Sequence, residues 1–569
     1  MKLHQRSDRE VFPDHTNLLR AQFSDYPSRK PFIQDENTWR ENQINFEFLE
    51  NAIQSELFSG HYSQCLRIIE SIPLKNFRNA PILYVYQTLA MLFSNYLADE
   101  IKAQLRKAVD EDPNELIKGE IMAAQALIQS YLGEQDLGEQ LFLKALVKIP
   151  HENLLFKQII ERNLGMVYMI KGELHKAAKW YESLLLSSHK LQDQNGILAA
   201  YNYLTTIRKV QGRFNDAEVI YNKALEYIHE NHLHELPHSI KIFAGYGHLL
   251  TQRHEIEEAK KYLRKAILLA KQADIVLTQK AYQDLSEIFI REYDFRGALA
   301  NIQECRQNIQ HRNCKYLQLF NQLLLATEAR IHLEAGRIDQ AYSWLTISGF
   351  EEVSPNDLYA KFGNQLGYIL PIAVSIYLRK NQDNKAIEIL TACIPKFLHA
   401  GANAYLIRAL NAAAVTYHKM GEKQKAIKAL AKAIDLAKPE NNLGDFIFIG
   451  RNLMPLLYEI LQSGIETEFS GKLLAVFSTI SDSNTSAAHM INTIDPLSKR
   501  ELDVLHLIAK GMTNREIAGT LFLSANTIKS HSIKIYRKLK VRNRTQAVSK
   551  ARLLGILPSK FPSQFQTSA

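Results

Sequence analysis

A sequence pattern that recurs about every 40 residues through most of the chain constrains the fold more than any other feature. The clearest copy is residues 163–186, and residues 204–224 repeat its apolar, small and turn positions. Each copy fits two helices joined by a short turn, since Gly172 and Gly212 separate stretches of helical periodicity. One helical pair leaves an apolar face uncovered, so we expect consecutive pairs to stack into a solenoid.

One small or apolar position marks the register of the second helix in every copy. It is occupied, at spacings of 36–45 residues, by Cys65, Ile101, Gly138, Ala177, Ala217, Ala259, Ala298, Ala341, Ala386 and Ala426. A small side chain there lets two helix backbones approach, and the large residue four positions later, such as Tyr181, fills the adjacent groove. The other turns carry Gly60, Gly133, Gly336, Gly421, Tyr96, His254, Tyr293 or Asn381. Most tyrosines are therefore predicted to be core residues.

The pattern resembles the tetratricopeptide repeat, including prolines just after second helices at Pro113, Pro150 and Pro439. Its period exceeds the 34 residues of that repeat and is similar to the sensor domain of maltose-regulator (MalT) type transcription activators. The resemblance implies an all-α, tetratricopeptide-like helical-pair solenoid. Those regulators also carry an N-terminal ATPase domain. We expect no such domain in this chain, so ATP dependence does not carry over.

Composition and motif spacing divide the chain and exclude several classes of protein. We expect a partly ordered arm at 1–45, a solenoid of about ten repeats plus capping helices at 46–480, a linker at 481–494, a helical module at 495–558 and a flexible tail at 559–569. With 46% hydrophobic and 23% charged residues, the chain is typical of a globular protein. No apolar run is long enough to span a membrane, and no secretory signal is expected. The four cysteines are scattered without a CxxC pair, which favours a reducing cytoplasm.

The positive charge of the chain is concentrated near its C-terminus. The net charge is +9, and residues 496–557 alone contain thirteen Lys or Arg against three Asp or Glu. A dense basic patch on a compact domain attracts a polyanion, and nucleic acid is the first candidate.

The basic module has the helix signals of a helix-turn-helix domain. Ser498 with Glu501 and Thr513 with Glu516 predict capping boxes, Ser524 and Asn543 predict two further helix starts, and Gly511 ends the first helix. The expected apolar faces are Leu502, Leu505 and Ile508; Ile517, Ala518 and Leu521; Ile528, Ile535 and Leu539; and Ala547, Val548, Ala551 and Leu554. The short turn between the second and third helices places the third in the DNA major groove.

The outward face of this third helix supplies the candidate DNA contacts. The candidates for base reading are Asn526, Lys529, Ser530, Ile533 and Lys534. Residues at helix ends and rims are candidates for phosphate binding, namely Thr513, Asn514, Ser524, Thr527, Arg537, Lys538, Arg542, Arg544 and Thr545.

The module resembles the LuxR-type DNA-binding domain over about 62 residues. The resemblance rests on Leu497, Glu501, Val504, Leu505, Gly511, Asn514, Glu516, Ile517, Ala518, Leu523, Ser524, Thr527, Lys529, His531, Lys538, Leu539, Val541, Arg544, Ala547, Val548 and Ala551. Ser530 departs from the family, whose members often carry an apolar residue at that position.

Two local matches to catalytic motifs are set aside. His234–His238 reads HELPH and matches a zinc-protease motif, but Pro237 would break the helix that the motif needs, and a surface loop is expected. Residues 464–472 (GIETEFSGK) have the wrong glycine spacing for a phosphate loop and no preceding strand. We therefore expect no enzyme activity, no cofactor and no metal site.

Together these features predict a cytoplasmic, bacterial transcription regulator. Its partners would be double-stranded promoter DNA, RNA polymerase, a second copy of the chain as a homodimer on DNA, and a small-molecule or protein effector on the solenoid; no membrane is involved. The alternative is a repeat scaffold or adaptor that sequesters a protein partner without binding DNA. Because DNA binding weakens steeply with salt, salt dependence distinguishes the two.

Overall fold

The computed structural model describes residues 46–58, 62–72, 80–94, 96–112, 114–151, 153–272, 279–310, 317–463, 467–482, 499–521, 523–538, 541 and 543–553. Within these residues every regular element is helical and no strand occurs, which confirms the all-α class. The expected arm, most of the linker and the tail lie outside the described residues. None of the described helices is long and apolar enough to cross a bilayer.

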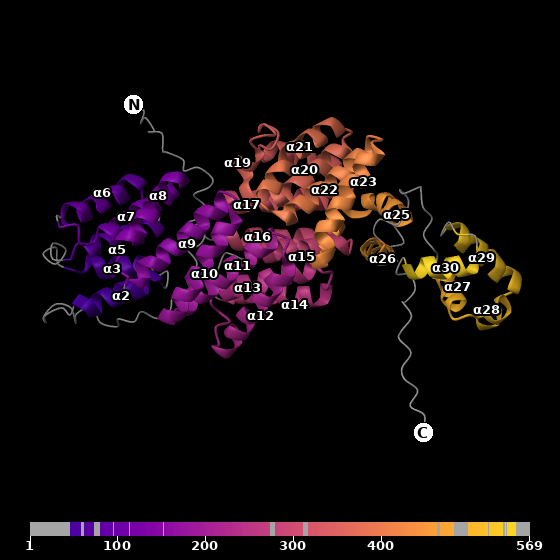
Figure 1. Cartoon of the computed structure of the whole chain (residues 1–569), viewed down its shortest axis with the longest axis horizontal. Helices are drawn as coiled ribbons and strands as arrows, with labels where there is room; N and C mark the ends of the chain where they lie inside the picture. Colours follow the sequence, from indigo (N-terminus) through magenta and orange to yellow (C-terminus); the bar gives the residue numbers. More distant parts are fainter. Residues whose placement is uncertain are drawn as a thin grey trace, which may run out of the picture. The chain divides into compact units, whose positions relative to one another are not determined.

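Helical pairs follow one another along the chain, as the repeat predicts (Figure 1). The pairs are α2 (Phe46–Phe58) with α3 (Tyr62–Glu70), α5 (Ile82–Phe93) with α6 (Ala98–Asp110), α7 (Lys118–Tyr131) with α8 (Gln135–Lys148), α9 (Leu154–Ile170) with α10 (Leu174–Leu191), α11 (Gln194–Val210) with α12 (Phe214–Glu230), α13 (Pro237–Gln252) with α14 (Ile256–Gln272), α15 (Gln279–Arg291) with α16 (Phe295–Gln310), α17 (Leu317–Glu334) with α18 (Ile338–Ile347), α20 (Leu366–Arg379) with α21 (Asp383–His399), and α22 (Asn403–Lys419) with α23 (Lys423–Ala437).

Shorter elements interrupt or follow the pairs. A short helix and a 3-10 turn separate the α18 and α20 pairs, namely α19 (Leu358–Phe362) and η2 (Gly363–Gln365). The segment after the last pair contains η3 (Lys438–Glu440), α24 (Gly444–Ile449), η4 (Gly450–Leu453), α25 (Met454–Ser463) and α26 (Glu468–Asp482). The C-terminal module contains α27 (Lys499–Ala509), α28 (Asn514–Leu521), α29 (Ala525–Lys538) and α30 (Arg544–Leu553).

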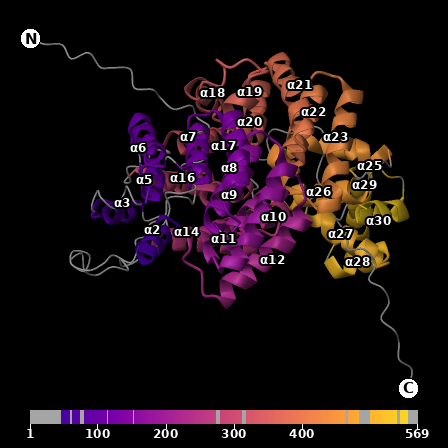
Figure 2. The same cartoon turned by 60° about the vertical axis from the view of Figure 1, so that its left-hand side comes forward.

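Contacts between Cα atoms divide the chain into two compact units. The first comprises the described residues up to Ile288 with Phe295–Ile372 and Ala392–Tyr405, and the second comprises Phe289–Asp294, Ala373–Thr391 and the described residues from Leu406 onward. In the first unit, the first helices of successive pairs contact one another from α5 through α7, α9 and α11 to α13, and each second helix packs on its own first helix (Figure 2). This is the arrangement of a helical-pair solenoid.

The register positions identified from the sequence are all buried. The alanines, Cys65 and Ile101 are at most 3% exposed, and Gly138 is buried in α8. The close approach occurs where a small residue of a first helix meets a large residue of a second helix. A Cβ on Gly165 would lie 2.6 Å from Cζ of the fully buried Tyr181, and one on Gly247 would lie 2.7 Å from Cγ of Leu263. These contacts explain why Gly165 and Gly247 of the first helices must be small.

The turns inside the pairs adopt the left-handed backbone conformation. Gly172, Gly212 and Gly336 have φ values of 75°, 74° and 77°. Copies without glycine still use this conformation, at His254, Tyr293 and Asn381, with φ of 57–66°. The turn geometry therefore belongs to the repeat itself, and glycine is the residue that adopts it without strain. Gly60 lies outside the described residues.

Replacing two of these glycines separates the strain of the turn from packing. A Cβ at Gly336 would meet nothing within 4 Å, whereas one at Gly212 would lie 3.1 Å from Cβ of Asn403. We expect Gly336→Ala to lower stability by about 1–2 kcal/mol through backbone strain alone. Gly212→Ala should cost more, because it also pushes α22 away. Thermal unfolding of both variants tests this, and an equal loss would contradict the packing contribution.

Candidate nucleic-acid interface

The C-terminal module is a small helical domain whose core comes from all four of its helices. Helix α29 contacts α27, α28 and α30 (Figure 1). The buried apolar side chains are Val504, Leu505 and Ile508 from α27, Ile517 and Ala518 from α28, Ile528 and Ile535 from α29, and Ala547 and Ala551 from α30. Leu502, Leu521 and Val548 are half-buried. Leu539 and Leu554 lie outside the described residues. The predicted apolar faces are otherwise confirmed.

Helices α28 and α29 form the helix-turn-helix. Gly511 ends α27 with φ of 88°, and the backbone N–H of Leu523 donates to the carbonyl of Ala518 at 2.9 Å in the turn. The hydroxyl of Ser524 then accepts from the N–H of Thr527 at 3.1 Å, so Ser524 caps α29 as predicted. A neutral hydroxyl cap leaves the positive end of the α29 dipole available to an anion.

The face of α29 that points away from the core carries the predicted base-reading residues. Asn526, Lys529, Ser530 and Lys534 are exposed, and Ile533 is 58% exposed although it is apolar. Arg537 is exposed one turn further on. Helix α29 contains no acidic residue, so nothing on the helix itself neutralises this face. The structure thus brings these six residues together on one accessible surface.

The predicted capping box of α28 is also present. Oγ1 of Thr513 accepts from the N–H of Glu516 at 3.4 Å, and the Glu516 carboxylate accepts from the backbone N–H and hydroxyl of Thr513 at 2.6 and 2.9 Å. These hydrogen bonds, the backbone one first, lower the pKa of Glu516. The carboxylate therefore stays ionised at the start of α28, where a negative charge interacts favourably with the helix dipole. Asn514 beside it is half-buried.

Two residues predicted to bind phosphate have structural partners instead. Nζ of Lys538 lies 2.8 Å from Oε2 of Glu501, with side-chain exposures of 14% and 4%. The guanidinium of Arg544 donates to the carbonyls of Ile508 and Met512 at 2.9 and 2.6 Å, which ties α30 to the end of α27. Both side chains therefore have contacts within the module, which stabilise it.

The remaining predictions for the module fall partly outside the described residues. Arg542 and Ser498 lie outside them, as does the side chain of Thr545. Glu501, predicted to complete a capping box with Ser498, directs its carboxylate to Lys538. Sequence reasoning missed this ion pair and also Arg500, whose guanidinium donates to the carbonyl of Leu521 at 2.6 Å. Glu501 and Lys538 are both among the residues that carry the LuxR resemblance, and this was the only feature of the sequence that could have indicated their pairing.

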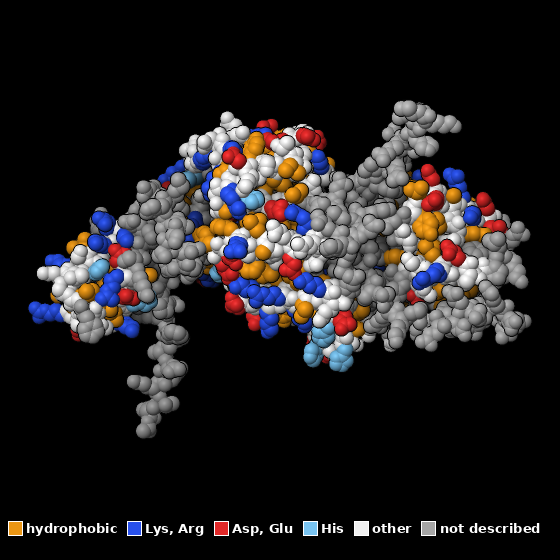
Figure 3. Space-filling model, turned by 180° about the vertical axis from the view of Figure 1, so that it is seen from behind, with side chains coloured by type: hydrophobic (Ala, Val, Ile, Leu, Met, Phe, Trp, Pro, Cys, Tyr) orange, Lys and Arg blue, Asp and Glu red, His pale blue; other side chains and the backbone are white. Residues whose placement is uncertain are grey.

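The two catalytic motif matches have no catalytic geometry. Helix α13 begins at Pro237, so the HELPH segment is divided between a turn and a helix start. The sequence predicted a surface loop here, but the side chain of His238 is only 3% exposed. The nearby His229, His232 and His234 form a pale blue surface patch (Figure 3), yet no group of side chains in the described part of the chain could hold a metal. Gly471 and Lys472 lie within α26 rather than in a phosphate loop.

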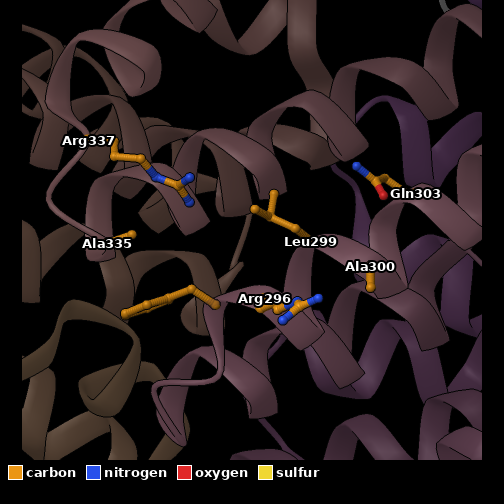
Figure 4. A pocket seen from close by; sticks show the side chains of 7 residues that line it. Arg296, Leu299, Ala300, Gln303, Ala335 and Arg337 are labelled. Atoms are coloured by element: carbon orange, nitrogen blue, oxygen red, sulfur yellow. The ribbon is translucent and has the colours of Figure 1, made fainter.

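A surface hollow of about 600 Å³ lies on the first unit between α16 and the turn that precedes α18 (Figure 4). It is lined by Phe295, Arg296, Leu299, Ala300, Gln303, Ala335 and Arg337. Arg296 and Arg337 are exposed, and the hollow has few polar groups that converge on one point. It does not define a ligand site.

Comparison with known proteins finds two family models that match separate parts of the chain. The family model described as the MalT-like TPR region matches residues 119–463, and the model for bacterial regulatory proteins of the luxR family matches residues 495–551. The first match covers more than half of the chain, and the chain belongs to the family of proteins with a MalT-like TPR region. The LuxR-type helix-turn-helix module follows that region.

Curated relatives include HTH-type transcriptional regulators named MalT. The chain is 24% identical over 463 residues to the HTH-type transcriptional regulator MalT of Yersinia enterocolitica, covering 78% of this chain and 50% of that protein. The protein of the same name from Yersinia pestis strain Pestoides F is 23% identical with the same coverage. The chain thus spans about half the length of these relatives. Among solved structures, a Rap protein complexed with competence and sporulation factor matches 64% of this chain with a TM-score of 0.48 and 11% identity.

Proposed function

We propose that this protein is a sequence-specific DNA-binding transcription regulator whose helical-repeat domain senses an effector and controls promoter binding. The observation that carries the proposal is the exposed face of α29, which combines Lys529, Lys534 and Arg537 with polar side chains and no acid. A helix of this kind fits the major groove, with its N-terminal half on base edges.

The exposed residues have distinct proposed roles. Lys529 and Lys534 donate to guanine O6 and N7, Asn526 pairs with adenine, Ser530 suits either partner, and Ile533 contacts a thymine methyl group. Backbone phosphates would be held by Arg537, by Arg542, and by the polar groups at helix ends, namely Thr513, Asn514, Ser524, Thr527 and Thr545. Only the first group discriminates between sequences.

The partners follow from this role. Two-fold operators are typical of helix-turn-helix dimers, so we propose a homodimer on double-stranded promoter DNA. Regulation of transcription from that site implies contact with RNA polymerase. It also implies that an effector binds the solenoid. The protein would act in a bacterial cytoplasm. Catalysis is not part of the proposal, because the family matches and the relatives are regulators.

Salt dependence of DNA binding tests this function against the adaptor alternative. We expect the affinity of the full-length protein for duplex DNA to fall steeply between about 50 and 200 mM salt, with a slope near −0.9 per phosphate contact. Arg537→Ala should flatten that slope by about one unit for all sequences alike. Lys432→Ala, an exposed lysine of α23, is the matched control and should change nothing. Absence of DNA binding at low salt would favour the protein-capturing scaffold.

A further inference from the structure

The surface hollow between α16 and the turn that precedes α18, named here the α16 hollow, carries a cation where other repeats carry an acid. Arg296 lies in the first turn of α16, two residues before the register position Ala298. The same position is occupied by Asp99 in α6, Asp136 in α8, Glu257 in α14 and Asp339 in α18. The positive end of the helix dipole stabilises an acid at this place and disfavours a cation. Helix α16 has no acid in its first turn that would offset Arg296.

The second arginine of the α16 hollow departs from the repeat in the same way. Arg337 is the N-cap residue of α18, four residues before the register position Ala341. Five other copies have an acid at this place, namely Glu134, Glu173, Glu255, Asp294 and Glu422. Arg213 also occupies it, but its guanidinium pairs with Asp216 in the first turn of α12. In the part of the chain that the structure describes, no such ion pair is present for Arg296 or Arg337. Departures from a local rule without compensation are typical of functional surfaces.

The floor of the α16 hollow is apolar. Phe295 and Leu299 lie one turn apart on α16 and are half-buried, and Ala300 beside them is exposed. In other second helices, longer side chains stand at the position of Ala300, namely Gln140, Lys179, Lys261, Glu388 and Lys428. The methyl group of Ala300 therefore leaves space that these side chains would fill. Figure 4 shows the side chain of Arg337 extending from its turn toward Leu299.

The shape of the α16 hollow suits a segment of protein better than a small molecule. Its volume is about 600 Å³, but it lacks the convergent polar groups that fix a small molecule in a pocket. The lining of α16 from Phe295 to Gln303 runs for about 12 Å along the helix, at about 1.5 Å per residue. About four residues of an extended peptide span that length. An apolar floor with arginines at its edge is the composition of a protein interface.

The charges of the α16 hollow select an acidic segment. A guanidinium pairs with a carboxylate through two parallel hydrogen bonds and gives up its hydration more readily than an ammonium. A nucleic acid fits less well, because exposed acids flank both arginines. Asp294 precedes Arg296 by two residues, and Asp339 follows Arg337 by two. They would repel a continuous row of phosphates, whereas one or two carboxylates can lie at the guanidinium groups.

We propose that the α16 hollow docks an acidic segment of a protein effector, in which a large apolar side chain stands next to the carboxylates. The guanidinium groups of Arg296 and Arg337 bind the carboxylates, and the apolar side chain covers Leu299 and Ala300. The role as effector rests on the proposed function, whereas the docking itself does not. Because the lining comes from two consecutive repeats, the docked segment would hold α16 and the start of α18 in one arrangement.

Selection from a random peptide display library by the full-length protein tests the docking. Peptides of about 12 residues are long enough to span the hollow when extended. We expect enrichment of Asp or Glu next to Leu, Ile, Phe or Met. The affinity of the enriched peptides, measured by fluorescence anisotropy, should fall about ten- to a hundredfold in Arg296→Gln with Arg337→Gln. The matched control is Arg106→Gln with Arg264→Gln, which removes two exposed arginines of α6 and α14 and should bind as wild type does.

Ala300→Gln tests the floor of the hollow without a change of charge. The position is exposed on a helix, so the substitution is compatible with folding. It should weaken binding of the same peptides several-fold, and Ala103→Gln, at the same repeat position of α6, should not. The proposal is overturned by absence of acidic and apolar residues among the selected peptides, by equal affinity in the two double variants, or by unchanged affinity in Ala300→Gln.

DNA binding measured on the same samples separates this inference from the proposed function. DNA binding without peptide binding overturns the docking alone. Peptide binding without DNA binding overturns the proposed function, and with it the effector role, but leaves the docking intact. Where both are present, a saturating concentration of peptide should change the affinity for DNA, and an unchanged affinity would overturn the effector role.

Discussion

Lys538→Met should destabilise the C-terminal module by about 3–5 kcal/mol, because it leaves the Glu501 carboxylate buried without its cation. The two charges are 2.8 Å apart, with side-chain exposures of 14% and 4%, so water does not replace the lost partner. Small domains are only about 5–15 kcal/mol stable, and the loss is therefore a large fraction of the total. Circular dichroism and hydrogen exchange in α27–α30 of the full-length protein measure it.

Lys534→Met is the control, since it removes the same charge from an exposed position of the same helix. It should leave the module folded and weaken only DNA binding. Adding Glu501→Gln to Lys538→Met removes the uncompensated charge and should restore much of the lost stability. If Lys538→Met were as stable as Lys534→Met and only bound DNA less well, Lys538 would be a phosphate contact after all.

Arg330→Met should produce a loss of similar size in the solenoid. Nε of Arg330 lies 2.9 Å from the carboxylate of Glu287, and the hydroxyl of Tyr368 donates to the other oxygen at 2.7 Å. Both charged residues are 4% exposed, so their network joins α15, α17 and α20 inside the core. Breaking one side of such a pair costs about 3–5 kcal/mol. Local hydrogen exchange is the suitable measurement, because repeat proteins do not unfold in one step.

Arg306→Met is the matched control for that variant. Arg306 pairs with Glu328 at 2.9 Å but is 30% exposed, and surface pairs contribute only about 0–1 kcal/mol. Exchange in α17 should therefore accelerate strongly in Arg330→Met and hardly at all in Arg306→Met. Equal effects would show that the buried network has no special energetic role.

The sequence predicted the features of the fold that depend on local spacing. The register from Cys65 to Ala426 could be read because each copy has a small or apolar residue at the same place in its second helix, and all of these positions are buried. The outward face of α29 could be read because helical periodicity separates Lys529 and Lys534 from Ile528 and Ile535.

Pairings between distant residues could not be read in this way. Glu501 meets Lys538 across 37 positions, and Glu287 meets Tyr368 across 81 positions. Periodicity gives the face on which a side chain lies, but not its partner on another helix. His238 was predicted to lie in a surface loop because a proline at position 237 would break a helix interior, whereas Pro237 begins α13 and His238 is buried beside Tyr203.

The most direct test of the central claim is selection of duplexes from a random library by the full-length protein at about 150 mM salt. The account predicts an enriched motif, with half-sites spaced by about one helical turn if the protein is a dimer. Lys529→Ala should relax the motif at one position by about 1–3 kcal/mol, and Lys432→Ala should leave it unchanged. Absence of any motif, or the same motif from wild type and Lys529→Ala, would contradict the claim that α29 reads DNA sequence.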